Sequence, residues 1–202
     1  MSFISIENLT TRYNTSKGLV HALEDVSFAI DKGESIGIAG ESACGKSTLG
    51  LSIIRMISNG KIYSGNINFD GRSLLDVNDD DFNKNIRWKE ISMVFQGAMN
   101  SLDPVFSIQQ QFEEVLKQHN FKGEMKESII ESLISVNLDE SILKKFPHEL
   151  SGGMKQRVVI AMALILKPKS FALLACILPE ILTTLCRFNP SSKVMDSPFT
   201  IT

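Results

Sequence analysis

The sequence predicts an α/β protein that carries an additional helical subdomain. Apolar and polar residues alternate along residues 3–8 and 20–30, as they do in half-buried strands. SIGIAG at residues 35–40 and ISMVF at residues 91–95 are short apolar runs, which is typical of buried strands. Over residues 107–166 the apolar spacing changes to that of helices. Strands therefore come first, a helical block is inserted, and the chain returns to helix and strand.

The other elements follow in chain order. Asp31-Lys32-Gly33 turns the chain, and LGLSIIRMI at residues 49–57 is apolar around most of its circumference, as in a buried helix. YSGNINFDG at residues 63–71 predicts a turn and a strand that an Asp-Gly pair closes. Further helices are predicted at residues 107–119, 125–137 and 140–146, and from Ser151 to about Leu166.

The composition is that of a soluble globular domain. Of the 202 residues, 43% are hydrophobic and 22% are charged, which suits a chain with a buried core. The net charge of −2 produces no strong field, so no nucleic-acid partner is expected. The three cysteines, Cys44, Cys176 and Cys186, give neither a disulfide framework nor metal-ligand spacing, which favours a reducing cytosol.

Neither a signal peptide nor a membrane-spanning helix is predicted. The N-terminal MSFISIENLT lacks a basic start and a long apolar run. The most apolar region, Val158–Leu182, is interrupted by Lys167-Pro168-Lys169 and by Glu180, whereas a spanning helix needs roughly 20 predominantly apolar residues. A buried helix followed by a buried strand accounts for the same residues.

A phosphate-binding loop is predicted at residues 40–48, GESACGKST, which match the pattern G-x-x-x-x-G-K-[ST] between a predicted strand and a predicted helix. Gly40 and Gly45 permit backbone angles that let successive N–H groups converge on phosphate oxygens. The helix that starts near Gly45 directs its positive end at the anion. Lys46 reaches the β- and γ-phosphates, and the Ser47 hydroxyl can ligate Mg²⁺.

The whole loop is expected to contact the nucleotide. Its residues are Gly40, Glu41, Ser42, Ala43, Cys44, Gly45, Lys46, Ser47 and Thr48. Cys44 lies at a helix N-terminus near a lysine, so it is either an oxidisable thiol or a small residue tolerated in a tight loop, and we favour the second reading. This loop alone does not distinguish kinases, GTPases and ATPases.

A second glycine-rich helix start occurs at residues 150–157, LSGGMKQR, about 100 residues after the first. One triphosphate has little use for two such sites on one chain. If two chains pair head to tail, each phosphate loop faces Ser151, Gly152 and Gly153 of the other chain. This segment resembles the signature of the ATP-binding cassette (ABC) ATPases. The alternative is that Ser-Gly-Gly is only a flexible turn. The Gln-Arg pair that follows it and the phosphate loop upstream argue against this alternative.

The resemblance narrows to the ATP-binding subunits of peptide and nickel importers. MVFQGAMNSLDPVFSI at residues 93–108 and FPHELSGGMKQRVVIAMAL at residues 146–164 are similar to that subfamily. The resemblance covers residues 3 to about 169. It implies a phosphate-loop NTPase (RecA-like) core with an antiparallel β subdomain and an inserted α-helical subdomain at about residues 97–150.

Roles for two further residues follow only from the resemblance. It implies that Gln96 touches Mg²⁺ and the attacking water, and that Tyr13 stacks on adenine. Without it, Gln96 is an ordinary polar strand end and Tyr13 is a strand-edge tyrosine. The chain also departs from the family here, because Ala43 stands where glycine is frequent and Gly97-Ala98 stands where an acidic residue and proline are usual.

The resemblance stops after Lys169. The family continues with an apolar strand that ends in Asp-Glu, which hold Mg²⁺ and polarise water, and later with a histidine at the γ-phosphate. Here SFALLACIL leads to Pro179-Glu180, and no Asp or Glu lies between Glu149 and Glu180. Asp196 is the only later acid, and no histidine follows His148.

Three explanations are open for this tail, residues 170–202. Glu180 could be the catalytic acid on a displaced strand, the chain could be a natural non-hydrolysing member, or it could be a truncated or frame-slipped copy. We favour the third, because all downstream motifs are lost together. The core would then be incomplete at its C-terminal end and expose a parallel sheet edge, so poor expression or aggregation is expected.

The resemblance implies a cytoplasmic subunit that is peripheral on the inner face of the membrane. Its cofactors would be ATP and Mg²⁺, and its partners a second ABC ATP-binding subunit and membrane permease subunits, with no direct contact to the solute. Hydrolysis by this copy is expected to be absent or very slow. The alternative is a non-catalytic nucleotide-binding fragment or pseudo-ATPase.

Overall fold

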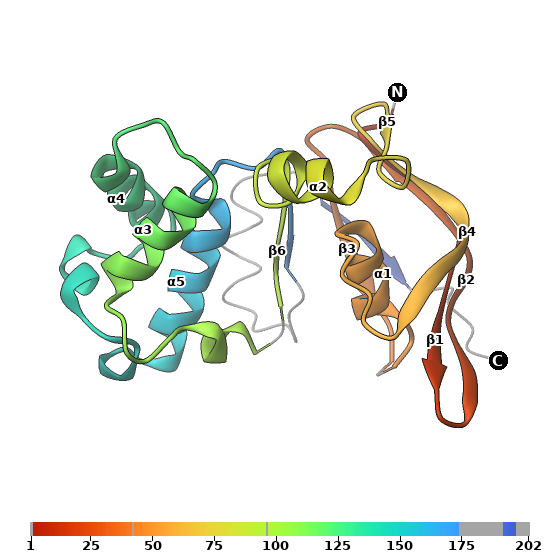
Figure 1. Ribbon diagram of the computed structural model, residues 1–202, viewed down its shortest axis with the longest axis horizontal. Helices are drawn as coiled ribbons and strands as arrows, with labels where there is room; N and C mark the ends of the chain where they lie inside the picture. The colour runs from red at the N-terminus through yellow and green to blue at the C-terminus, as the bar shows by residue number, and fades with distance from the viewer. Residues whose placement is uncertain (1, 42, 96, 174–191, 197–202) are drawn as a thin grey trace. The chain divides into compact units, whose positions relative to one another are not determined.

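The computed structural model of this protein describes residues 2–41, 43–95, 97–173 and 192–196 (Figure 1). Contacts within the chain divide it into two compact units. The first unit contains the described residues up to 82 together with residues 192–196, and the second contains the described residues from 83 to 173. Each unit is described by itself.

The first unit contains an antiparallel sheet of four strands in the order β2-β1-β4-β5. These strands are β1 (Ile4–Thr15), β2 (Gly18–Ile30), β4 (Gly60–Phe69) and β5 (Arg72–Ser73). The hairpin of β1 and β2 pairs Ile4 with Ile30 at one end and Thr15 with Gly18 at the other. The predicted antiparallel subdomain is therefore present.

Strand β1 runs well beyond the predicted residues 3–8. Its register with β2 shifts between Ile6 and Leu9, where Asn8 has φ 49° and Asp25 has φ 52°. The Asn8 side-chain amide donates a hydrogen bond to Asp25, at 2.5 Å. A bulge of this kind adds an unpaired residue and interrupts the alternation of side chains between the two faces. The sequence pattern breaks at the bulge, although the strand continues.

The phosphate-loop segment lies between β3 (Ser35–Ala39) and α1 (Lys46–Ile53). The predicted helix at residues 49–57 thus begins three residues earlier and ends at Ile53, because Ile54 caps it and Arg55 adopts a left-handed conformation with φ 55°. Thr11 of β1 and Ser52 of α1 share a buried hydrogen bond of 3.1 Å, which ties the helix to the sheet.

Strand β3 pairs in parallel with β8 (Ser192–Asp196), in a register that runs from Ser35 opposite Ser192 to Ala39 opposite Asp196. The sequence did not predict a strand in this part of the tail. The strand that leads into the phosphate loop thus has a parallel neighbour from the end of the chain. Farther along the chain, α2 (Asp79–Asp81) is followed by a π-helical turn, η1 (Phe82–Ile86), whose residues from Asn83 on belong to the second unit.

In the second unit, β6 (Ile91–Val94) pairs in parallel with β7 (Ser170–Leu173). The predicted strand after Lys169 is confirmed for its first four residues, and Glu180 lies outside the described residues. The helices between these strands are α3 (Ile108–Gln118), α4 (Met125–Ser135) and α5 (Gly152–Leu164), with short 3-10 helices η2 (Ala98–Ser101), η3 (Glu140–Lys144) and η4 (Pro147–Glu149).

The apolar spacing of the sequence locates these helices well. Phe112 of α3, Leu133 of α4 and Val158 of α5 are completely buried. The Ser132 hydroxyl donates to the carbonyl of Ala161 at 2.6 Å, which joins α4 to α5. The segment predicted as a helix at residues 140–146 is instead a 3-10 helix that ends at Lys144. Lys145 and Phe146 are extended, and at Phe146 the following Pro147 disfavours helical geometry.

Among the described residues, no helix has both the length and the apolar character needed to cross a membrane. Helix α5 ends at Leu164, and Lys167 then adopts a left-handed turn with φ 51° before β7 begins. The apolar region is therefore divided into a helix and a strand, as its central Lys-Pro-Lys segment predicts.

The stability of the second unit should decrease below neutral pH because of His119. This residue caps α3, and its ring packs against Trp88 with the centroids 5.8 Å apart. Burial, with a smaller effect from Lys89, lowers the pKa of His119 below its ordinary value. The unfolded chain then takes up the proton first as pH falls through about 6.5, so the free energy of unfolding should fall.

The measurement is denaturant unfolding between pH 8 and 5.5. His119→Gln should remove part of this pH dependence, and His148→Gln, the same change at an exposed position, should retain it. An unchanged pH profile for His119→Gln would show that His119 does not contribute.

Candidate functional site

The phosphate loop turns into α1 at Gly45, which caps the helix with φ 86° and ψ −1°. Its carbonyl accepts the first helical hydrogen bond, from the Leu49 N–H at 2.9 Å. A Cβ atom at this position would lie 2.5 Å from the carbonyl oxygen of Ala22 and 2.9 Å from Leu23 Cδ2. Only glycine fits, because the backbone angle is left-handed and strand β2 lies directly against the loop.

The Lys46 ammonium group contacts three residues of the phosphate loop. Nζ donates to the carbonyls of Gly40 at 2.7 Å and Glu41 at 2.5 Å, and lies 3.2 Å from Cys44 Sγ. No acidic residue occurs in the first turn of α1. The ammonium and the positive end of the helix dipole therefore occupy the same small region, which favours an anion there.

Tyr13, near the end of β1, contacts the first turn of α1. Its hydroxyl donates to Thr48 Oγ1 at 3.4 Å, and a Cβ atom at Gly60 would lie 2.8 Å from Tyr13 Cδ1. Thr48 is buried, whereas the neighbouring Ser47 is exposed. The structure thus brings the predicted adenine-stacking residue to the predicted phosphate loop.

Ala43, which stands where the family frequently has glycine, has a strained backbone conformation. It has φ 67°, a left-handed conformation that costs an L-residue with a side chain roughly 1–2 kcal/mol. We expect Ala43→Gly to raise the free energy of unfolding by about 1 kcal/mol, because the side chain is exposed and little packing is lost. Denaturant unfolding measures the change, and a decrease in stability would show that the Ala43 methyl group makes contacts that outweigh the strain.

A second helix start in the second unit has a similar character. Ser151 caps α5, where its hydroxyl accepts from the Met154 N–H at 3.3 Å. Gly152 and Gly153 are exposed, and the first turn of α5 contains no acidic residue. A Cβ atom at Gly153 would meet nothing within 4 Å. Alanine would fit there and is favoured in helices by about 1 kcal/mol, so the fold of this unit does not itself require glycine at this position.

These two glycine-rich helix starts and the spacing between them agree with a comparison to known protein families. A family model described as ABC transporter matches residues 23–173. The chain belongs to the ABC transporter family. The match includes the phosphate loop and the Ser-Gly-Gly segment, and it ends with strand β7.

Relatives within the ABC transporter family include peptide transport proteins. The chain is 41% identical over 174 residues to the oligopeptide transport ATP-binding protein AppD of Bacillus subtilis, which covers 83% of this chain and 53% of AppD. It is 38% identical over 173 residues to the oligopeptide transport ATP-binding protein OppD of Escherichia coli, which covers 83% of this chain and 51% of OppD. The chain therefore spans about half the length of these relatives.

The fold is also that of solved ABC cassettes. A dimeric structure of the bacterial ABC transporter cassette MJ0796 superposes with a TM-score of 0.78 at 26% identity, and covers 96% of this chain and 87% of that chain. The α/β phosphate-loop core with an antiparallel sheet and a block of helices, predicted from the sequence, is thus confirmed.

Three predicted site residues of this ABC chain, Ser42, Gln96 and Glu180, lie outside the described residues. Their roles stay predictions. On either side of Gln96, β6 ends at Val94, and Gly97 caps η2 with φ 77°. A left-handed glycine after the strand marks a sharp turn, so the Gly97 that departs from the usual acidic residue has a conformational role here.

The sequence predicts Mg²⁺ as a cofactor of this chain, with Ser47 as one of its ligands. Within the described parts of the chain, no group of three or more His, Cys, Asp or Glu side chains could hold a metal ion. Mg²⁺ usually keeps several waters and binds through phosphates and one or two protein oxygens, so the exposed Ser47 hydroxyl beside the phosphate loop fits that chemistry.

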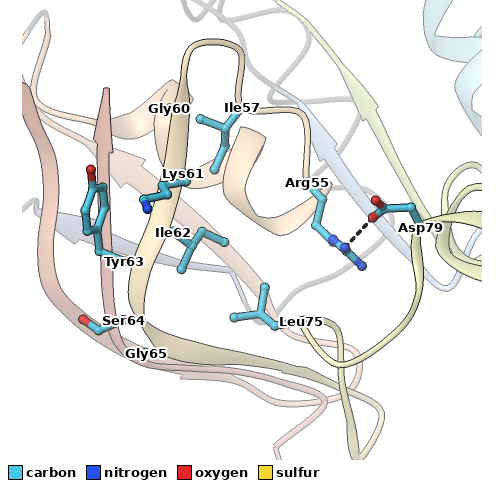
Figure 2. A pocket seen from close by; sticks show the side chains of 10 residues that line it. All are labelled: Arg55, Ile57, Gly60, Lys61, Ile62, Tyr63, Ser64, Gly65, Leu75 and Asp79. Carbon is cyan, nitrogen blue, oxygen red and sulfur yellow. Dashed lines mark hydrogen bonds and ion pairs between the residues drawn. The ribbon is translucent and has the colours of Figure 1, made fainter. Parts of the chain in front are cut away.

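A hollow of about 610 Å³ on the first unit is a separate feature (Figure 2). The residues that line it come from the segment between α1 and β4, from β4, from the segment before α2 and from the first residue of α2, and none belongs to the phosphate loop. Arg55 crosses its edge and donates to the carbonyl of Val77 at 2.6 Å and to Asp79 at 2.5 Å. The Arg55 guanidinium therefore joins residues 77–79 to the turn that follows α1, and we assign Arg55 a structural role.

Proposed function

We propose that this chain is an ATP-binding subunit of an ABC importer, which binds Mg-ATP between two such subunits and thereby energises uptake of peptides. Nickel-like solutes are the other cargo class that the sequence resemblance allows. The observation that carries the proposal is the phosphate loop, where Gly45, the Lys46 ammonium and the N-terminus of α1 lie together, an arrangement that favours a bound anion.

The position of Tyr13 supports a nucleotide rather than a simple anion. Its contact with Thr48 places an aromatic ring near the phosphate loop. Aromatic rings stack on nucleic-acid bases, with about 1–3 kcal/mol per base. We infer that Tyr13 supports the adenine while the loop binds the phosphates, and that Ser47 ligates the Mg²⁺ that the nucleotide carries.

Helix α5, which begins at the Ser-Gly-Gly segment and is called the signature helix below, supports a dimer of two such subunits. Its exposed N-terminus carries no acidic side chain, and glycine stands at position 153 although the second unit alone would tolerate alanine there. A glycine that its own fold does not need is explained by the close approach of another molecule. We infer that this molecule is the nucleotide on a second ABC subunit, which would make the site complete only in a dimer. Membrane permease subunits would be the remaining partners.

Hydrolysis is expected to be very slow or absent. In the sequence, no Asp or Glu lies between Glu149 and Glu180. Attack of water on the γ-phosphate needs a group that orients or polarises the water. The alternative function is therefore a non-catalytic nucleotide-binding subunit, and the missing acid pair is the observation that favours it.

Lys46→Ala should weaken nucleotide binding about 10- to 100-fold, because hydrogen bonds to charged groups contribute about 1.5–3 kcal/mol. The measurement is the Kd of a fluorescent ATP analogue with Mg²⁺, together with steady-state release of phosphate from ATP. Lys32→Ala, the same change in the exposed turn before β3, is the matched control and should bind as the wild type does.

The outcomes separate the two candidate functions. Binding that depends on Lys46 without phosphate release supports the non-catalytic subunit, whereas phosphate release that Lys46→Ala abolishes supports the ATPase. Equal binding by the wild type and Lys46→Ala, with both proteins folded, would contradict a nucleotide site at this loop.

A further inference from the structure

The hollow on the first unit lies along an open edge of the antiparallel sheet (Figure 2). Strand β5 pairs only with Asn68 and Phe69 of β4, and among the described residues no strand pairs with residues 60–66 on that side. All residues from 60 to 65 line the hollow, although successive side chains of a strand point to opposite faces. The hollow therefore runs along the edge of β4 rather than over one face. The backbone groups of such an edge can pair with another strand.

The hollow has the size and the lining of a site for an extended peptide. Its volume of about 610 Å³ lies within the range of about 300–1,000 Å³ that is usual for ligand sites. Across the hollow from β4 lies the ion pair between Arg55 and Asp79. Three partly buried apolar residues, Ile57, Ile62 and Leu75, also line it. An apolar side chain of an added strand would find contacts there.

The edge of β4 also carries positive charge. Lys61 is exposed, and its Nζ lies 4.8 Å from the centroid of the Tyr63 ring, a side chain that is 39% exposed. The Arg12 guanidinium lies 5.1 Å from the same centroid, and its charge is offset by an ion pair with Glu24. Within the described part of the chain Lys61 has no such ion pair, so the edge would attract a carboxylate.

A second copy of this chain fits the edge poorly. Pairing of two β4 strands would bring two positively charged edges together, and lysine on an edge strand is a common means of preventing such pairing. An acidic strand from another protein meets no such repulsion. Charge therefore selects the occupant.

We propose that residues 60–66 of β4 are a docking site for an extended, acidic segment of a partner protein, which adds a strand to the sheet. Strand addition of this kind takes affinity from main-chain hydrogen bonds and specificity from the side chains. An acidic side chain of the segment would lie at Lys61, and the neighbouring apolar side chain would enter the hollow at Ile62. Acidic and apolar residues would thus alternate in the segment.

The test is the fluorescence anisotropy of a labelled peptide of alternating valine and glutamate, as long as residues 60–66, titrated with the full chain. This peptide should bind the wild type. A peptide with lysine in place of glutamate should bind more weakly, because it is repelled by Lys61. A valine-glutamate peptide with N-methylated amides should not bind, because it cannot donate hydrogen bonds to β4. Equal binding of the N-methylated peptide would overturn the proposal.

Substitutions test the charge and the place of binding. Lys61→Glu should weaken binding of the glutamate peptide about tenfold and strengthen that of the lysine peptide, because an attractive cross-strand pair becomes repulsive and the reverse. Lys17→Glu, the same change in the exposed turn between β1 and β2, should bind both peptides as the wild type does. If Lys61→Glu does so too, the proposal is wrong. Lys46→Ala should retain binding, and its loss there would mean that the peptide occupies the phosphate loop instead.

Hydrogen exchange of the wild-type chain locates the peptide without any substitution. With the glutamate peptide, backbone amides of residues 60–66 should exchange more slowly, whereas those of β2, the opposite edge of the sheet, should be unchanged. Protection of β2 without protection of β4 would contradict the proposal. So would a dimer that protects residues 60–66 without any peptide, because the occupant would then be a second copy of this chain.

Discussion

Gly45→Ala is expected to lower the free energy of unfolding by about 2–5 kcal/mol. The left-handed φ of 86° costs a residue with a Cβ atom roughly 1–2 kcal/mol. The new methyl group would also lie 2.5 Å from the carbonyl oxygen of Ala22, and overpacking of this kind costs about 1–3 kcal/mol more. The free energy of unfolding of a domain is only about 5–15 kcal/mol, so this one methyl group would remove a large fraction of the stability.

Gly33→Ala is the matched control for this prediction. Gly33 has φ 80°, close to that of Gly45, but a Cβ atom there would meet nothing within 4 Å. It should therefore lose only the conformational part, about 1–2 kcal/mol. Denaturant unfolding of both variants measures the difference. Equal losses would show that β2 does not crowd the loop.

Gly153→Glu is expected to change stability and assembly in opposite directions. Glutamate is a better helix former than glycine by about 1 kcal/mol, and a carboxylate in the first turn of a helix adds about 0.3–1 kcal/mol. The open space at Gly153 can take the side chain, so the chain should become slightly more stable.

Dimer formation with Mg-ATP should be lost in the same variant. The new carboxylate would stand where we propose that the partner's γ-phosphate binds, and like charges in contact across an interface cost several kcal/mol. A loss of several kcal/mol corresponds to a dimer that is weaker by more than about 100-fold. Analytical ultracentrifugation with and without Mg-ATP measures this loss.

Gly153→Gln separates charge from size, because glutamine has the same shape without the charge. It should weaken the dimer less than Gly153→Glu does. If the two variants are equally defective, steric exclusion rather than charge is responsible. If Gly153→Glu forms the dimer as the wild type does, the signature helix does not face a phosphate.

The motif-bearing parts of the fold were predictable because their physics is local. A phosphate loop needs glycine at the turn and a helix directly after it, and the spacing of Gly40, Gly45 and Lys46 states this in the sequence. The helices of the second unit were equally visible, since burial on one side of a helix requires apolar residues at regular intervals. Their ends were less exact: the helix predicted to reach residue 146 ends at Lys144, because Lys145 is already extended.

The parts that were missed depend on contacts between distant residues. The alternation in β1 breaks at the bulge near Asn8, so the sequence alone ended that strand too early. The hydrogen bond between Tyr13 and Thr48 is a tertiary contact, whereas in the sequence a strand-edge tyrosine was nearly as good an interpretation as an adenine-stacking residue. Strand β8 has no strong pattern of its own, and only its pairing with β3 defines it.

The close packing of Gly45 against β2 has a consequence for which nucleotides the proposed site would accept. The hairpin that presses on the loop also carries Tyr13 on β1, so the ring and the loop belong to one framework with little slack between them. With Tyr13 on the adenine and the loop on the phosphates, as we propose, the sheet sets the distance between the two binding places. We therefore expect nucleotides whose base and phosphates are farther apart or closer together to bind more weakly.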